Sequence, residues 1–371
     1  MSRLTSIGMQ LDKNTNSPFA VQIIYQNGKY IEFISDQIKP FNFSDLINVK
    51  GDGKTSFNLN ISTSFVDMSS IGEDIDGAME LSLPIAFHNK PKIFALVDGG
   101  WLPPAFVSPP NFLVDRNVVS VLSQVSSGSI RTDQQSTNWW LQFPTLSDVS
   151  INPVLYALEG CKQTSQTFEE FCRSFEEAYG IIERTLPNTT ILSYSDADYK
   201  VVYEFISNAV ERHERETKFL VSVAPTLVAR CADNKLSDCR KYILEKTDLF
   251  GLNRKSLVVL AALSCIYEPK DGNGLLAARE VLKPNKEYSE REAFNSISDL
   301  QALEIYILSL SPDIPRHFLC TCDRGLAGLW CGLKPKNIHW NGDDFSYDMA
   351  INEVLFPRLK EEERNESFLF Q

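Results

Sequence analysis

Two short apolar runs, each ending in an aspartate, place the strongest limit on the folds open to this chain. They are residues 111–115 (NFLVD) and 317–323 (HFLCTCD), and helical sequence fills much of the chain between them. In residues 167–184, for example, apolar side chains recur every three or four positions with glutamates between them, which predicts an amphipathic helix. Parallel strands need crossover connections of this kind. We therefore expect an α/β fold with a central parallel sheet flanked by many helices.

The N-terminal part of the chain has the pattern of β-strands. Residues 19–34 (FAVQIIYQNGKYIEFI) contain two β-branched and aromatic runs separated by an Asn-Gly dipeptide, which suits a type I′ hairpin turn. Further on, Phe57, Leu59 and Ile61 alternate with polar neighbours, so they should share one face of a strand. This region is expected to be mainly strands.

A proline-rich segment separates the two parts. Residues 99–110 (GGWLPPAFVSPP) hold four prolines and two glycines, which oppose a continuous helix or a central strand. We therefore predict a β-rich accessory domain at residues 1–107 and an α/β domain at residues 108–360. Helical sequence at about 161–286 enlarges this second domain.

Composition and charge limit the classes of protein. The formal net charge of -12 argues against a surface coated in basic residues that would grip nucleic acid everywhere. A nuclease that holds metal with clustered carboxylates nevertheless adds negative charge of its own. No stretch approaches the ~18 consecutive apolar residues of a membrane helix, and the start lacks a secretory signature. The 8 cysteines lack the paired C-x2-C spacing of a zinc site. We expect a cytoplasmic protein with reduced thiols and no membrane partner.

Four acidic residues stand where a metal site would place them. Asp115 and Asp323 each follow an apolar strand, at the carboxyl end where open α/β sheets bind ligands. Glu159 ends an apolar helical run, INPVLYALEG, in which the final glycine supplies the stop. Asp299 follows Ser298, which we expect to begin a helix whose free amides favour a nearby carboxylate. Two strand ends and two helices could thus converge on one cleft.

The order of these acids resembles the PIN-like domain family of nucleases, over residues 111–344. The segments that carry the resemblance are LVDRNVVSVL, INPVLYALEG, ISDLQALEIYIL and TCDRGL. The last segment departs from the family pattern because its leucine follows one residue early. Compact family members lack the long helical stretch between the second and third acids, and residues 1–107 lie outside the resemblance.

The resemblance implies a metal-dependent endonuclease. One or two Mg²⁺ or Mn²⁺ ions would be held by Asp115, Glu159, Asp299 and Asp323, and would activate water for attack on a phosphodiester. Hard oxygen ligands suit these cations. Family habit favours RNA over DNA as the substrate, and a role as a toxin or an antiviral effector.

Five further residues are candidates for supporting roles. Asn117 would orient the first aspartate, Thr321 would hydrogen-bond a carboxylate, and Arg324 would contact a phosphate oxygen. Asp343 and Asp344 follow the last strand closely enough to add a late ligand. All five are expected near the metal or the substrate.

Simpler interpretations exist for each acid taken alone. An aspartate at a strand end is more often a turn residue or a helix cap, and a glutamate at a helix end is often exposed. The alternative function is therefore a catalytically silent PIN-like or helical protein-interaction module. In either case the N-terminal strands could recruit a partner protein, and exposed edges and helix faces allow a homo-oligomer.

Overall fold

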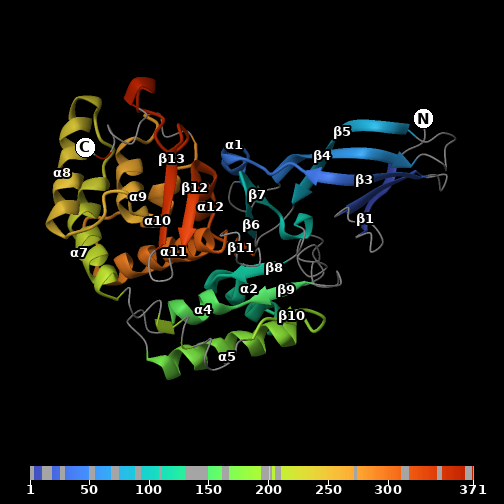
Figure 1. Ribbon diagram of the computed structural model, residues 1–371, viewed down its shortest axis with the longest axis horizontal. Helices are drawn as coiled ribbons and strands as arrows, with labels where there is room; N and C mark the ends of the chain where they lie inside the picture. Colours follow the sequence, from blue (N-terminus) through green and yellow to red (C-terminus); the bar gives the residue numbers. More distant parts are fainter. Residues whose placement is uncertain are drawn as a thin grey trace.

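The fold is α/β, with a mixed sheet of mostly parallel strands flanked by helices (Figure 1). It is seen in a computed structural model of the full chain. The structure describes residues 4–10, 19–25, 30–49, 55–67, 75–87, 93–107, 111–129, 149–160, 167–193, 200, 203–204, 210–270, 274–310, 317–340, 345–363 and 370.

The central sheet has six strands in the order β10-β9-β8-β11-β6-β7. Its strands are β6 (Phe94–Val97), β7 (Gly100–Leu102), β8 (Asn111–Val114), β9 (Ser150–Asn152), β10 (Thr190–Ile191) and β11 (Phe318–Thr321). The neighbours β10, β9, β8 and β11 are parallel, whereas β6 pairs antiparallel with both β11 and β7. The predicted parallel sheet is therefore present, and two antiparallel strands extend it.

The strand order reverses between β8 and β11. From β8 the chain moves outward to β9 and then β10, and it returns on the other side of β8 as β11. The last paired residues are Val114 and Cys320, and the Asp115 N–H donates to the Cys320 carbonyl oxygen at 3.2 Å. Such a reversal leaves a crevice beyond the carboxyl ends of the two strands, where ligands bind in open α/β sheets.

Helices cover this sheet and continue beyond it. They are α2 (Arg116–Ser126), α4 (Val154–Glu159), α5 (Phe168–Thr185), α7 (Val210–Leu227), α8 (Leu236–Leu249), α9 (Leu257–Ile266), α10 (Ala277–Leu282), α11 (Glu290–Leu308) and α12 (Arg324–Gly332). Two buried side chains fix α11 and α12 to β6: Tyr306 Oη donates to the Leu96 carbonyl oxygen at 2.6 Å, and Trp330 Nε1 donates to that of Val97 at 2.7 Å. No described helix has both the length and the apolar composition needed to cross a membrane.

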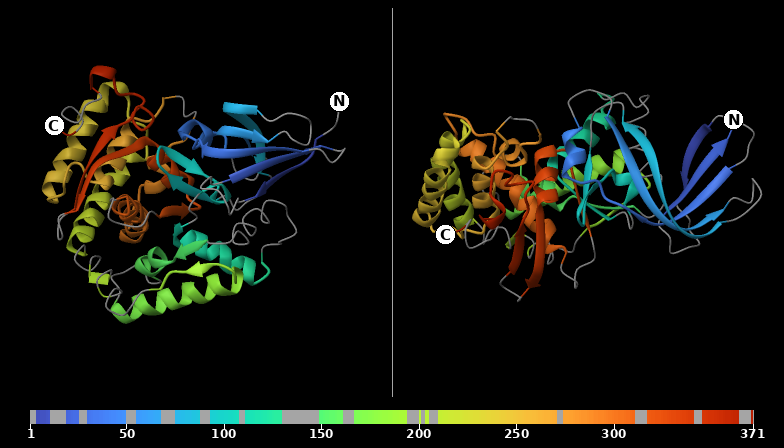
Figure 2. Two further views of the ribbon diagram at one scale, coloured as in Figure 1. Left: turned by 45° about the vertical axis from the view of Figure 1, so that its right-hand side comes forward. Right: turned by 90° about the horizontal axis from the view of Figure 1, so that it is seen from above.

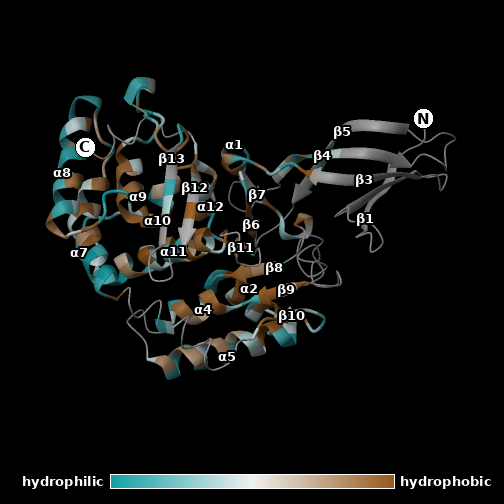
Figure 3. Cartoon of the chain, in the orientation of Figure 1, coloured by the Kyte–Doolittle hydropathy of each residue, from teal (hydrophilic) through white to brown (hydrophobic). Residues whose placement is uncertain are grey.

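The helix predicted from periodicity at residues 167–184 is confirmed as α5. In α5, Thr167 and Glu170 form a reciprocal capping box, and Phe171 and Phe175 are buried on its apolar face. Every residue of α9 is buried, and its sequence LVVLAALSCI is almost entirely apolar. Figure 3 shows α9, β8 and β9 in hydrophobic brown, whereas α8 carries much hydrophilic teal.

The N-terminal strands form a separate antiparallel sheet in the order β1-β2-β3-β4-β5. They are β1 (Leu4–Gln10), β2 (Phe19–Tyr25), β3 (Tyr30–Ile38), β4 (Thr55–Asp67) and β5 (Ile75–Phe87). The predicted hairpin is the pair β2 and β3, although its Asn27-Gly28 turn lies outside the described residues. On β4, Phe57, Leu59 and Ile61 are buried, which confirms the predicted face.

The two sheets meet through α1 (Phe43–Ile47) and the residues just before it (Figure 2). Phe41 and Trp101 exchange two backbone hydrogen bonds of 2.9 Å. Their rings lie 4.9 Å apart, and Phe57 and Phe94 also pack on Trp101. This approach requires Gly100, because a Cβ there would lie 2.0 Å from the Phe41 carbonyl oxygen.

The predicted junction at residues 99–110 therefore does not separate the sheets. β6 and β7 precede residue 107, yet they pair in the central sheet because Trp101 and Leu102 bury their side chains there. Similarly, the helical region predicted at 161–286 contributes the strand β10. After α12, a two-stranded antiparallel sheet is formed by β12 (Leu333–Trp340) and β13 (Phe345–Ile351).

Candidate functional site

Asp115 is a buried helix cap at the carboxyl end of β8. Its Oδ1 accepts the Val118 N–H at 2.8 Å and so caps α2, and only 6% of the residue is exposed. Burial raises the pKa of this carboxyl to about 7, against hydrogen bonds from Thr321 and the Val118 N–H. Repulsion from Glu159 and Asp323 adds to the shift. Asp115 is therefore both a helix cap and a carboxylate with other carboxylates nearby.

Asp323 stands in the equivalent place after β11. Its Oδ1 accepts the Leu326 N–H at 2.9 Å and caps α12. Thr321, which is fully buried, connects the two aspartates: it hydrogen-bonds the Asp115 carboxylate, and its Oγ1 accepts the Asp323 N–H at 2.9 Å. The predicted contact of Thr321 with a carboxylate is thus present.

Glu159 lies at the end of α4, as predicted, with Gly160 at φ 65° as the stop. Burial raises the pKa of its carboxyl, and the Arg116 guanidinium opposes this. The Arg116 side chain also donates to the Gly160 carbonyl oxygen and lies over the Tyr156 ring. The end of α4 is therefore held next to the start of α2.

The predicted helix start at Ser298 is wrong. α11 begins after Ser289, which forms a capping box with Glu292, so Asp299 sits in the middle of the helix. The helix begins after Ser289 because Ser289 and Glu292 form a capping box, and its apolar periodicity then continues without a break through Ser298. Helix-terminus amides therefore do not stabilise Asp299.

The four predicted acids nevertheless lie close enough to one another for charge repulsion among them to raise the pKa values of Asp115 and Asp299. The pKa of Asp299 is raised well above its ordinary value, mainly by burial and then by repulsion from Asp323, with smaller contributions from Asp115 and Glu159. Asp115, Glu159 and Asp299 line a common cleft of about 20 Å³, whose other walls include Leu155, Leu158 and Leu326. This volume holds roughly one water or one ion. Asp115, Glu159 and Asp299 thus reach one small cleft from three segments that are far apart in sequence, and Asp323 acts electrostatically on Asp115 and Asp299 from a fourth.

Lys283 is a member of this site that the sequence did not reveal. It ends α10 in the left-handed conformation, with φ 48°, and its Nζ lies 3.9 Å from Asp323 Oδ2. Its charge also opposes the raised pKa of Asp299. A lysine at positive φ is uncommon and costs backbone energy. Helix-end glycines are the usual signal for such a position, and here that signal is absent.

The other supporting candidates have different surroundings. Arg324 forms a two-pronged ion pair with Glu280 of α10 and donates to the Val49 carbonyl oxygen at 2.7 Å, so it joins elements rather than facing the cleft. The Asn117 side chain is exposed on α2. Asp343 and Asp344 lie outside the described residues.

The donor set suits a hard divalent cation. Asp115 and Asp323 each use Oδ1 as a cap, Thr321 also hydrogen-bonds the Asp115 carboxylate, and Lys283 Nζ lies 3.9 Å from Asp323 Oδ2. Glu159 and Asp299 add two more carboxylates, and carboxylate oxygens are the ligands that such cations take. Within the described part of the chain, no three His, Cys, Asp or Glu side chains are close enough together to hold one ion. Binding by several of the four acids therefore requires changes of side-chain rotamer.

Comparisons with protein-family models, with curated proteins and with solved structures gave no match for this chain.

Proposed function

We propose that this chain is a metal-dependent nuclease that hydrolyses phosphodiester bonds, with a PIN-like arrangement of acids and with RNA as the preferred substrate. The convergence of Asp115, Glu159, Asp299 and Asp323 carries the proposal, since these acids come from four separate segments. Mutual repulsion of this kind is unfavourable unless a cation offsets it, and perturbed carboxylates gather at functional sites. The preference for RNA rests on the family resemblance alone.

The residues would divide the work as follows. Asp115, Glu159, Asp299 and Asp323 would hold Mg²⁺ or Mn²⁺, which when bound lowers the pKa of water and offsets charge on the phosphate. Asp115 and Asp323 are held in place as helix caps, and Thr321 fixes their mutual orientation. Lys283 would place positive charge beside a bound phosphate. The apolar wall of the cleft would limit access of bulk water.

The test is cleavage of labelled single-stranded RNA and DNA with Mn²⁺ or Mg²⁺. Wild type should cut, whereas Asp115→Asn, Asp323→Asn and a chelated sample should not. Asparagine is as good a helix cap as aspartate, so these substitutions remove charge and preserve the cap. Asp238→Asn, at an exposed position on α8, is the matched control and should cut like wild type.

Two results would contradict the proposal. One is cleavage by Asp115→Asn and Asp323→Asn at the wild-type rate. The other is a wild type that neither cuts nor binds Mn²⁺ in calorimetry. A third result would be intermediate: wild type binds Mn²⁺, both substitutions abolish that binding, and neither RNA nor DNA is cut. It would support the metal site and rule out these two substrates.

A further inference from the structure

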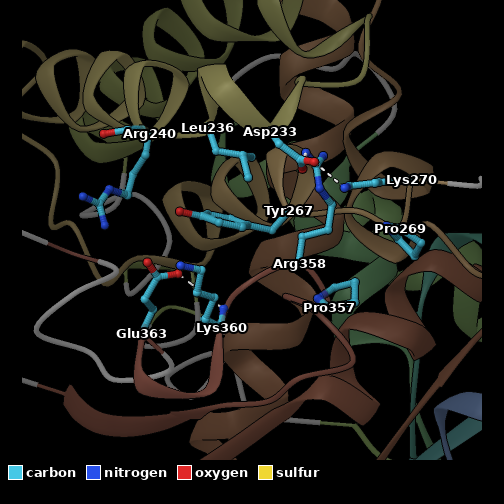
Figure 4. Close-up of a pocket in the computed structure, with 11 residues that line it drawn as sticks. Asp233, Leu236, Arg240, Tyr267, Pro269, Lys270, Pro357, Arg358, Lys360 and Glu363 are labelled. Atoms are coloured by element: carbon cyan, nitrogen blue, oxygen red, sulfur yellow. Dashed lines mark hydrogen bonds and ion pairs between the residues drawn. The ribbon is translucent and has the colours of Figure 1, made fainter.

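A larger pocket lies away from the acidic cleft (Figure 4). Part of its wall belongs to α8, which lies at one end of the molecule in Figure 1. The volume of the pocket is about 930 Å³, and its wall comes from residues 233–240, 267–270 and 357–363. These segments include η3 (Asp233–Lys235) and η4 (Glu361–Glu363). The pocket shares no lining residue with the cleft. Its size falls within the range of about 300–1,000 Å³ that is usual for small-molecule sites.

The pocket is positively charged although the chain is acidic. The chain has a formal net charge of -12. The charged side chains that line the pocket are the cations Arg240, Lys270, Arg358 and Lys360 and the carboxylates Asp233 and Glu363. A concentration of positive charge in a concave site attracts anions. The sign of the charge in this pocket is therefore opposite to that of the whole chain.

Arg358 supplies a fixed charge behind the pocket wall. Its side chain is only 9% exposed, and its guanidinium contacts Asp233 Oδ1 at 2.5 Å and the Cys231 carbonyl oxygen at 2.8 Å. Among the described residues, its buried Nε has no hydrogen-bond partner. Asp233 also pairs with Lys270, so one carboxylate serves two cations. Two of the four lining cations therefore share a single carboxylate.

Lys270 and Arg240 place further cations along the same wall. The Lys270 side chain is 67% exposed, and its ion pair with Asp233 lies at the surface, within reach of a ligand in the pocket. Arg240 hydrogen-bonds the Tyr267 hydroxyl, and Figure 4 shows the Tyr267 ring between Arg240 and Arg358. Apolar surface from Leu236, together with two prolines, completes the lining. The pocket thus combines cations with a nonpolar wall.

We propose that this pocket binds a small organic phosphate of nucleotide size. Arginine and lysine are the side chains that recognise phosphate oxygens, by paired hydrogen bonds and by charge. Lys270, Lys360 and Arg240 would contact the phosphates, and Arg358 would add its fixed charge. The apolar surface at Leu236 would accept the nonpolar part of the ligand, which a free inorganic anion lacks.

The test is calorimetric titration of the full chain in the presence of EDTA, which keeps metal out of the acidic cleft. The probes are ATP, pyrophosphate, adenosine and a short single-stranded RNA. We expect ATP to bind more tightly than pyrophosphate, and adenosine not to bind. The double variant Lys270→Gln and Lys360→Gln should weaken ATP binding by about tenfold or more, because it removes two phosphate contacts.

A second double variant controls for net charge. Lys241→Gln and Lys246→Gln remove the same charge from α8 outside the pocket lining, and they should leave the affinity for ATP unchanged. The proposal is overturned if wild type binds neither ATP nor pyrophosphate, or if the two double variants weaken ATP binding equally. It is also overturned if only the RNA binds and the pocket variant abolishes that binding. Circular dichroism checks that both variants fold.

Discussion

Thr321 hydrogen-bonds the carboxylate of Asp115, the residue that begins the helix after the neighbouring strand. The same hydroxyl oxygen accepts the backbone N–H of Asp323 at 2.9 Å. One buried side chain thus ties together the two helix caps that stand where the strand order of the sheet reverses. It thereby links the Asp115 carboxylate to the backbone of Asp323.

Thr321→Val should therefore weaken Mn²⁺ binding and cleavage by about 10- to 100-fold, the usual effect of losing a group that orients a metal ligand. Thr321→Ser keeps the hydroxyl and should retain most of both. Calorimetry with Mn²⁺ measures this independently of cleavage. Equal affinities for the valine and wild-type proteins would mean that the hydroxyl does not position Asp115.

Lys283→Gly should raise both the stability of the protein and its affinity for Mn²⁺. Glycine removes the cost of the left-handed backbone, about 1 kcal/mol. It also removes a charge that lies 3.9 Å from Asp323 Oδ2 and would repel a cation held there. We expect Mn²⁺ to bind about tenfold more tightly. Lys283→Gln should reproduce the gain in affinity without the gain in stability. A glutamine variant with wild-type affinity would show that the lysine and the metal do not interact.

Glu216 makes stability depend on pH. It is buried on α7, where its carboxylate lies 3.7 Å from the Arg212 guanidinium. Arg212 lies closer, at 2.7 Å, to Glu304 of α11. Tyr347 and His213 belong to the same cluster. Burial is the main cause that raises the pKa of Glu216 from 4.5 to about 8. Below pH 4.5 the carboxyl is protonated in both states. As the pH rises to 8, it ionises in the unfolded chain first, so folding loses stability.

Glu216→Gln stays neutral and should therefore be more stable than wild type at pH 8, by on the order of a few kcal/mol, with the difference shrinking toward pH 5. Urea unfolding at a series of pH values measures this. Glu211→Gln, at an exposed position of the same helix, should leave the unfolding free energy unchanged. A pH-independent difference between Glu216→Gln and wild type would contradict the raised pKa.

Two glycine-to-alanine substitutions should have opposite effects. At Gly325, a Cβ would lie 2.7 Å from the Glu280 Cβ and 3.0 Å from the Ala277 carbonyl oxygen, where α12 crosses α10. Gly325→Ala should cost about 1–3 kcal/mol through overpacking. Gly180→Ala in α5 meets only the end of the Arg184 side chain, at 3.2 Å, and should gain up to ~1 kcal/mol in helix propensity. Thermal unfolding compares them, and a neutral Gly325→Ala would show that the helices can move apart.

The sequence determined the local elements of this protein. Alternation placed Phe57 and Leu59 on the buried face of β4, and three- and four-residue spacing gave α5 with its capping box. Apolar runs followed by aspartates gave β8 and β11 and identified Asp115 and Asp323 as residues at strand ends. These features could be predicted because each depends on neighbours within a few positions along the chain.

Tertiary structure alone decided which distant groups meet. Asp299 reaches the cleft from the middle of α11, Lys283 lies next to Asp323 in an unusual backbone conformation, and Arg324 pairs with Glu280. The addition of β6 and β7 to the central sheet, and the basic pocket near α8, likewise join segments far apart in sequence. The physical reason is that periodicity and capping fix the shape of one element at a time. Contacts between elements depend on how all of them pack into one core.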